Sequence, residues 1–270
     1  MRIVYNLLVL LCPALLLVAC FPQAEARAVE GGLSVKPVGL SIALKDPDSK
    51  FNSSFSPGMQ PGVQVALLVE SAKRGIVSVA ANPKQAIKIS ADGKSISEED
   101  DDSWQFLHPR ISDDGKRATF NVSAEDLPAA DTAKLSVTGE LLVSTGSKTA
   151  EDEIQAKLVK GTKFKLAGIA VEVTEAGKPS WGEEPLSVTL NTSDPGGFDK
   201  IKSVEFHDKA GEQIKSKSGG SMTMNMGAHK QVSIDYRLGK KVDAATIKVV
   251  YYADLQTDPL PLKLEVGLGL

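Results

Sequence analysis

The body of this sequence contains no cysteine. The only two cysteines, Cys12 and Cys20, lie within or at the edge of an apolar N-terminal segment. The folded part therefore forms no disulfide and has no cysteine-ligated metal site. Its stability must come from the burial of apolar side chains.

Aromatic residues and net charge are also scarce. Only 5% of the 270 residues are aromatic, and the formal net charge is -3. Binding to nucleic acid relies on a basic surface that neutralises phosphates, so we expect no nucleic-acid partner. The few rings also leave little material for a surface on which sugars or bases stack.

The familiar catalytic patterns are missing too. There is no Gly-x-Ser-x-Gly elbow, no His-Glu-x-x-His pair and no glycine-rich phosphate loop. The three histidines, His108, His207 and His229, are far apart in the chain. The sequence therefore predicts a protein that is not an enzyme. The alternative is an enzyme whose site residues meet only in the fold.

The N-terminal segment carries an export signal. Arg2 precedes an apolar run over residues 3–19, and we assign residues 1–28 to the signal. Leu17-Val18-Ala19-Cys20 resembles the lipobox of bacterial lipoproteins, which implies lipidation of Cys20. Ala24-Glu25-Ala26 fits a signal peptidase site instead, with cleavage after Ala26 or Ala28.

Both interpretations of this segment place the protein outside the cytoplasm. It is expected in the periplasm, or at the outer membrane or cell surface as a lipoprotein. The lipid on Cys20 would then be its only contact with a membrane, since no later stretch approaches 18 consecutive apolar residues.

Beyond Gly31 the chain alternates between apolar and polar residues in short runs. Period-two alternation predicts half-buried β-strands, here at 40–44, 63–67, 118–122, 232–236 and 246–249. Turn signals such as Asp92-Gly93 separate the runs. No long window has the 3.6-residue period of a helix, so we expect an all-β protein.

The alternating runs repeat along the chain. Residues 39–44 match 168–173, 63–67 match 186–190, 115–137 match 227–249, and 157–161 match 263–267. This order predicts an internal duplication, with one domain at 29–161 and a second at 162–270. Each copy would have about seven strands, the size of an immunoglobulin-like sandwich. We expect each half to fold alone.

The export signal, the duplicated β pattern and the ending at residues 264–270 together resemble exported bacterial proteins made of tandem immunoglobulin-like domains. The resemblance implies two antiparallel β-sandwich domains and no particular functional residues. With the missing catalytic motifs, it suggests a non-catalytic interaction or structural module of the cell envelope. Its partner would be a protein or another envelope component.

Trp181 is a candidate for a contact surface. It lies between Ser180 and Gly182, a setting that disfavours burial, and exposed tryptophan tends to mark recognition sites. Trp104, in contrast, belongs to an alternating segment and is expected in a core.

Met222, Met224 and Met226 are two residues apart and would share one face of a strand. With His229 they supply thioether and imidazole ligands, a set that favours Cu(I), so a periplasmic Cu(I)-binding protein is the alternative function. The repeat aligns Met226-Gly227 with Asp114-Gly115, which predicts that Met226 lies at a turn and off the regular pleat. We expect the methionines to pack in the core or the hairpin and predict no cofactor.

Overall fold

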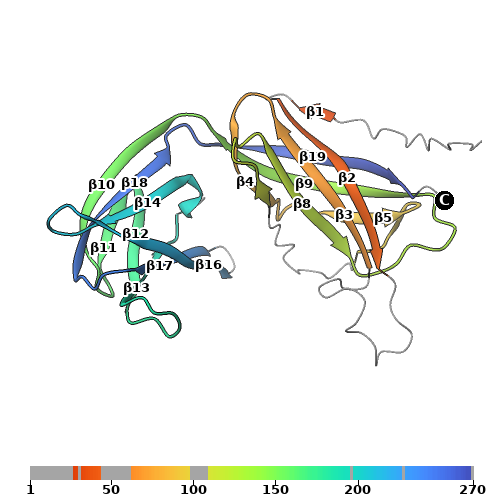
Figure 1. Cartoon of the computed structure of the whole chain (residues 1–270). Helices are drawn as coiled ribbons and strands as arrows, with labels where there is room; N and C mark the ends of the chain where they lie inside the picture. Colours follow the sequence, from red (N-terminus) through yellow and green to blue (C-terminus); the bar gives the residue numbers. More distant parts are fainter. Residues whose placement is uncertain are drawn as a thin grey trace, which may run out of the picture.

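A computed structural model describes residues 27–29, 32–43, 62–97, 109–194, 197–226 and 229–268. Cys20, Trp104 and His108 lie outside the described residues. Antiparallel strands dominate the described part (Figure 1), and its one helix is the short 3-10 helix η2 (Gly197–Lys200). The predicted all-β class is therefore confirmed. Among these residues no helix has the length and apolar character of a membrane span.

The strands surround two separate hydrophobic clusters, which define a first and a second lobe. The first lobe has one sheet of order β1-β2-β3-β8-β7 and a facing sheet of order β19-β9-β5-β6, in which β4 also pairs with β9. Its strands are β1 (Arg27–Val29), β2 (Leu33–Ala43), β3 (Gly62–Ser71), β4 (Gly75–Ala81), β5 (Lys88–Ala91), β6 (Lys94–Ser95), β7 (Arg110–Ile111), β8 (Arg117–Ala124), β9 (Lys134–Gly146) and β19 (Gln256–Gly267).

The second lobe has a sheet of order β10-β18-β14-β15 and a facing sheet of order β11-β12-β13-β17-β16. Its strands are β10 (Thr149–Lys157), β11 (Lys163–Leu166), β12 (Ile169–Gly177), β13 (Leu186–Thr192), β14 (Ile201–His207), β15 (Gln213–Ile214), β16 (Ser216–Met226), β17 (His229–Leu238) and β18 (Ala244–Tyr252).

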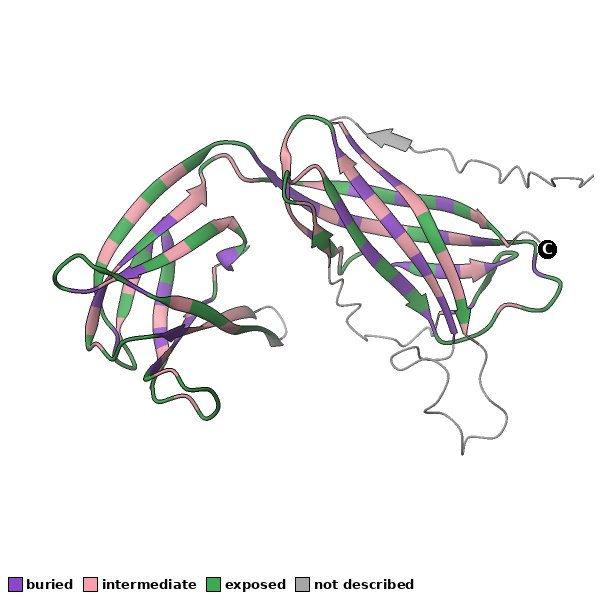
Figure 2. Cartoon of the chain, viewed as in Figure 1, coloured by how far each residue is buried: buried purple, intermediate pink, exposed green. Residues whose placement is uncertain are grey.

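These strands contain the runs of alternating apolar and polar residues from which the sequence predicts strands. Buried and exposed residues alternate without interruption along β8, and similar alternation runs through both lobes (Figure 2). The hairpin between β5 and β6 turns at Asp92 and Gly93, whose φ angles of 46° and 85° are both positive. Two consecutive positive φ angles are typical of the tight turn that matches the twist of paired strands.

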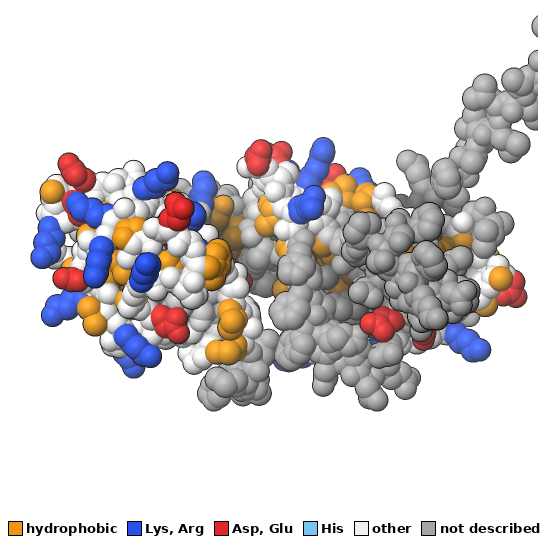
Figure 3. Space-filling view, turned by 60° about the horizontal axis from the view of Figure 1, so that its bottom comes forward, with side chains coloured by type: hydrophobic (Ala, Val, Ile, Leu, Met, Phe, Trp, Pro, Cys, Tyr) orange, Lys and Arg blue, Asp and Glu red, His pale blue; other side chains and the backbone are white. Residues whose placement is uncertain are grey.

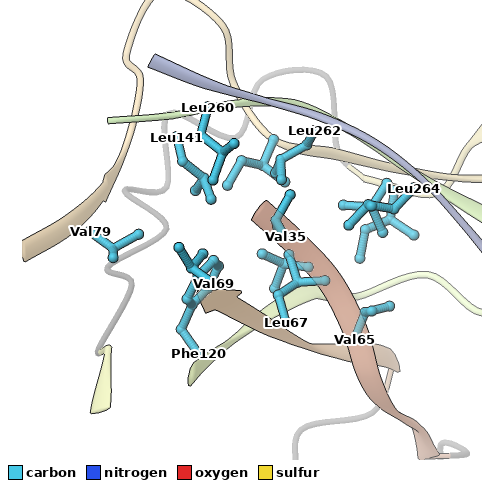
Figure 4. Close-up of a cluster of buried hydrophobic side chains, with 14 of the residues drawn as sticks. Val35, Val65, Leu67, Val69, Val79, Phe120, Leu141, Leu260, Leu262 and Leu264 are labelled. Atoms are coloured by element: carbon cyan, nitrogen blue, oxygen red, sulfur yellow. The ribbon is translucent and has the colours of Figure 1, made fainter. Parts of the chain in front are cut away.

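The C-terminal strand belongs to the first lobe, which differs from the predicted domain boundary. β19 pairs with β9 and buries Leu260, Leu262 and Leu264 in the first core. Figure 4 shows these leucines facing the residues of the opposite sheet. Conversely, β10 buries Ala156 in the second core. A division into 29–161 and 162–270 therefore fails, because each lobe needs a strand from the other half.

The first strand also overlaps the predicted signal segment. β1 already pairs with β2 at Arg27 and Ala28, opposite Val35 and Ser34. The paired part of the chain thus includes the last two residues of the predicted 1–28 segment.

The strands that join the lobes form one long ribbon. β9 pairs with β19 and β10 pairs with β18, and one register holds from Lys134 opposite Gly267 to Lys157 opposite Ala244. Regular pairing is interrupted only between these two blocks, at residues 146–148 and 253–255. The second lobe is thus inserted between β9 and β19 of the first.

Asp254 fastens the two strands where their pairing is interrupted. Its carboxylate accepts hydrogen bonds from the backbone N–H groups of Ser147 (3.0 Å) and Lys148 (2.9 Å) and from the Ser147 hydroxyl (2.7 Å). The Arg74 guanidinium lies 3.3 Å from it and also donates to the hydroxyl of Thr145 at 3.1 Å. These donors hold the pKa of the Asp254 carboxyl well below its usual range.

Candidate functional site

The outer face of the five-stranded sheet in the second lobe brings together the predicted contact and metal residues. On β17 the side chains of Ile234, Tyr236 and Leu238 pack on the second core, and Tyr236 lies against Phe206 with ring centroids 5.3 Å apart. Burial raises the pKa of Tyr236 to about 12. Alternation therefore turns the intervening β17 residues outward, away from the core.

Trp181 lies on this outer face, stacked on an arginine. Its side chain is 65% exposed, and the guanidinium carbon of Arg237 lies 3.2 Å from its ring centroid. Arg237 itself is only 3% exposed and donates a hydrogen bond of 2.9 Å to the backbone oxygen of Trp181. One ring face is therefore held by a buried cation while the tryptophan as a whole remains open to solvent.

An acidic residue sits beside this pair. Glu184 forms an ion pair with Lys217, whose hydrogen bond is the main reason that the pKa of Glu184 is lowered. The second carboxylate oxygen of Glu184, Oε2, is buried and has no hydrogen-bond partner, although it lies 3.9 Å from Nη1 of Arg237. The sequence did not predict a role for Arg237 or Glu184, because Arg237 follows Trp181 by 56 positions and meets it only in the fold.

A polar network extends from Arg237 along the sheet. Asp235 accepts hydrogen bonds from Ser187 and from Thr189 (3.4 Å), and its carboxylate lies 3.5 Å from Nε of Arg237. The edge strand β16 has a bulge beside Asp235, where Gly219 approaches so closely that a Cβ would overlap the carboxylate. A larger residue at this position would displace the Asp235 carboxylate from its hydrogen bonds.

Met222 and Met224 extend the outer face of the sheet along β16, toward the end of the hairpin that β16 forms with β17. Met222 lies opposite Ser233 and is 60% exposed, and Met224 is 41% exposed. We expected these methionines to pack in the core or the hairpin, and the structure places neither of these two in the core. Figure 3 shows hydrophobic side chains in small groups among charged ones on the side turned forward.

Met226 also differs from its predicted place. It is the last residue of β16 and pairs with His229, the first residue of β17. Regular pairing reaches Met226, so the prediction that it lies off the regular pleat is wrong. Met222, Met224 and Met226 occupy alternate register positions of β16 after the bulge.

The facing sheet of the second lobe carries a shallow cavity of about 410 Å³. Glu153, Lys248 and Glu205 lie side by side in the register of β10, β18 and β14, and Nζ of Lys248 is 3.6 Å from Glu153. The positive charge of Lys248 thus partly neutralises the carboxylates of Glu153 and Glu205 on the two neighbouring strands. Within the described ranges, no three His, Cys, Asp or Glu side chains are grouped to hold a metal ion.

His207 has a local structural role. Its ring lies 3.1 Å from the backbone oxygen of Gly211 and 3.2 Å from the carboxylate of Glu205. It therefore bridges the turn between β14 and β15.

Comparison with protein-family models, with curated proteins and with solved structures finds no match. The fold itself defines the class of protein: an all-β chain with several open antiparallel sheets. The outer face of β16 and β17, which joins Trp181 and Arg237 to the two exposed methionines, is its candidate functional site.

Proposed function

We propose that this chain is a non-catalytic, exported cell-envelope protein that acts as an interaction and structural module. The observation that carries the proposal is the state of Trp181, which is 65% exposed yet held in place by the buried Arg237. An aromatic side chain that is already ordered loses little conformational entropy on binding, so it suits a recognition site. The partner is a protein or another component of the envelope.

The ribbon between the lobes supports the structural part of this role. Both of its strands cross from one lobe to the other in a single register, and Arg74 and Asp254 bond across the break in pairing. Two covalent crossings restrict bending more than one flexible linker does. The first lobe therefore acts as a support that presents the outer face of β16 and β17.

We further propose that the two lobes are immunoglobulin-like sandwiches that arose by duplication. The order β2-β3-β8-β7 in the first lobe corresponds to β12-β13-β17-β16 in the second, and β9-β5-β6 corresponds to β18-β14-β15. In the sequence repeat, residues 157–161 at the end of the first copy match 263–267 at the end of the second. Under this proposal the last strands of the two copies, β10 and β19, each pair in the lobe of the other copy, with β18 and β9.

The contact surface is tested by capture with the immobilised full chain and a detergent extract of the cell envelope. We expect Trp181→Ala to weaken binding of the partner by a hot-spot cost of at least about 2 kcal/mol, roughly thirtyfold in Kd. Val159→Ser is the matched control, because Val159 is 52% exposed on the same lobe and should leave capture unchanged. Equal capture by all three proteins would refute the assigned surface.

Export is tested separately, at the N-terminal segment. If Cys20 carries a lipid, Cys20→Ala should move the protein from the membrane fraction to the soluble fraction. A soluble wild-type protein whose first residue is Arg27 or Val29 would instead support cleavage by signal peptidase. Retention in the cytoplasm with an intact N-terminus would overturn the export proposal.

A further inference from the structure

Strand β16 ends the five-stranded sheet of the second lobe and has one open side. In the order β11-β12-β13-β17-β16 it pairs, within the described part of the chain, with β17 alone (Figure 1). An edge strand presents a row of unpaired N–H and C=O groups to which another strand can add. With 11 residues, β16 is long for a strand in this position.

The other terminal strands of the described sheets are protected against such addition. β1, β6, β7, β11 and β15 have 4 residues or fewer. β10 carries the adjacent carboxylates of Glu151, Asp152 and Glu153, and β19 contains prolines, which have no N–H to donate. Beyond its bulge β16 has neither protection, because residues 220–226 include no charged residue and no proline.

Both faces of β16 are open to solvent along this uncharged stretch. Ser221, Met222, Thr223 and Met224 are all exposed, although successive side chains of a strand point to opposite faces. Met222 is 60% exposed and Met224 is 41% exposed. A strand added beside β16 would place side chains next to these methionines and remove part of their apolar surface from water.

The sequence around Thr223 is symmetric in a way that fits a second copy of the same strand. Met222 and Met224 flank Thr223. If two β16 strands pair antiparallel about Thr223, Met222 of each copy lies opposite Met224 of the other. Thr223 then lies opposite its own counterpart on the other face. Threonine pairs and apolar pairs in directly opposed positions stabilise antiparallel sheets, and this pairing opposes no like charges.

We propose that two copies of this chain form a dimer through β16, an interaction beyond the proposed contact function. A two-fold axis at Thr223 joins two five-stranded sheets into one continuous sheet. The bulge at Gly219 confines the pairing to residues 220–226, because it interrupts the regular register. Each copy uses its open edge on the other, so assembly stops at two copies. The interface is small, and we expect a micromolar Kd.

A disulfide at the two-fold axis tests the register. Cys12→Ser and Cys20→Ser remove the native thiols from the full chain, and Thr223→Cys supplies one new cysteine per copy. Directly opposed residues have Cα atoms about 4.5–5.5 Å apart, a separation that a disulfide can span. Mild oxidation should give a covalent dimer on a non-reducing gel. The matched control is Thr119→Cys, at another exposed threonine, on β8, which should give none.

Sedimentation equilibrium of the full chain in detergent, which masks the apolar N-terminal segment, tests the affinity. Thr223→Lys should weaken the dimer by about tenfold or more, because it sets two like charges opposite each other. Thr223→Glu should do the same alone. An equimolar mixture of the two variants should dimerise again, since lysine then faces glutamate, and this recovery also shows that both are folded. Thr119→Lys has the same net charge as Thr223→Lys and should dimerise like the wild type.

Three results would overturn the proposal: a wild type that stays monomeric at every concentration, species larger than a dimer, or a Lys and Glu mixture that stays monomeric. Addition of an extended segment from another protein would give the first of these. Trp181→Ala should leave the dimer intact, and Thr223→Lys should leave capture by the Trp181 surface unchanged. The two proposals can therefore fail separately.

Discussion

Leu264 lies opposite Val137 in the first sandwich, so the last strand of the chain completes a core that the first half begins. β19 also brings Leu260 and Leu262 into that core, and all three leucines are at most 4% exposed. Full burial of a leucine contributes about 1.5–3 kcal/mol. Together they rival the 5–15 kcal/mol by which a whole domain is usually stable.

The first prediction concerns fragments of the chain. Residues 147–254 contain every strand of the second lobe and should unfold cooperatively on their own. Residues 29–161 lack β19 and should not, unless a peptide of residues 256–267 is added. Thermal unfolding followed by circular dichroism measures both. A cooperative transition of 29–161 without the peptide would mean that β10 can fold back and replace β19.

The second prediction concerns the last strand, β19. Leu262→Ala should lower the free energy of unfolding by about 2–5 kcal/mol, because the side chain is fully buried and its removal leaves a cavity. Leu127→Ala is the control: Leu127 is 37% exposed, and its truncation should cost less than about 0.5 kcal/mol. Urea denaturation compares them, and equal effects would contradict the observed place of β19.

The third prediction concerns the junction. The folded pKa of Asp254 is lowered by Ser147, Lys148 and Arg74, so the ionised carboxylate stabilises the fold. This contribution is complete above the unfolded-state pKa of about 4 and is lost as the pH falls below it. Asp254→Asn should therefore lower stability at pH 7 and flatten its decline below pH 4.

Denaturant titrations between pH 7 and pH 2.5 measure this dependence, with Asp131→Asn as the control. Asp131 is exposed, and its replacement should leave the pH profile of the wild type unchanged. Parallel profiles for the wild type and Asp254→Asn would show that Asp254 does not fasten the ribbon.

The fourth prediction concerns the stacked pair on the second lobe. Trp181→Ala should destabilise the protein by about 1–2 kcal/mol, because a cation–π contact to the desolvated Arg237 is lost. Trp181→Phe should recover part of this loss, since phenylalanine keeps a ring face for the guanidinium. Denaturation monitored by circular dichroism measures both, and a loss as large for Phe as for Ala would argue against stacking.

Several features followed from local sequence. The strand at residues 117–124 and the turn at Asp92-Gly93 depend only on residues that are neighbours in the chain. Both were therefore predictable from the sequence. Trp181 was predicted to be exposed for an equally local reason, because its neighbours disfavour burial. The stacking of Trp181 on Arg237 could not be predicted, since Arg237 belongs to β17, which follows far later in the chain.

The methionines show why the faces of a strand were harder to assign. Alternation placed Met222, Met224 and Met226 on one face but did not say which face meets the core. In β16 the intervening residues are small or polar, so neither face is clearly apolar. The bulge at Gly219 then shifts the register, and pairing with β17 turns Met222 and Met224 outward.

The sequence by itself determined that this chain forms strands with alternating apolar and polar residues, because the period of two is a property of each strand alone. Only the tertiary structure decided which strand completes which sandwich. β10 directly follows β9, and β19 directly follows β18, so each could form a hairpin with the strand before it. Backbone hydrogen bonds would be the same with either partner. The choice rests on the long-range burial of the β19 leucines in the first core, which no local pattern encodes.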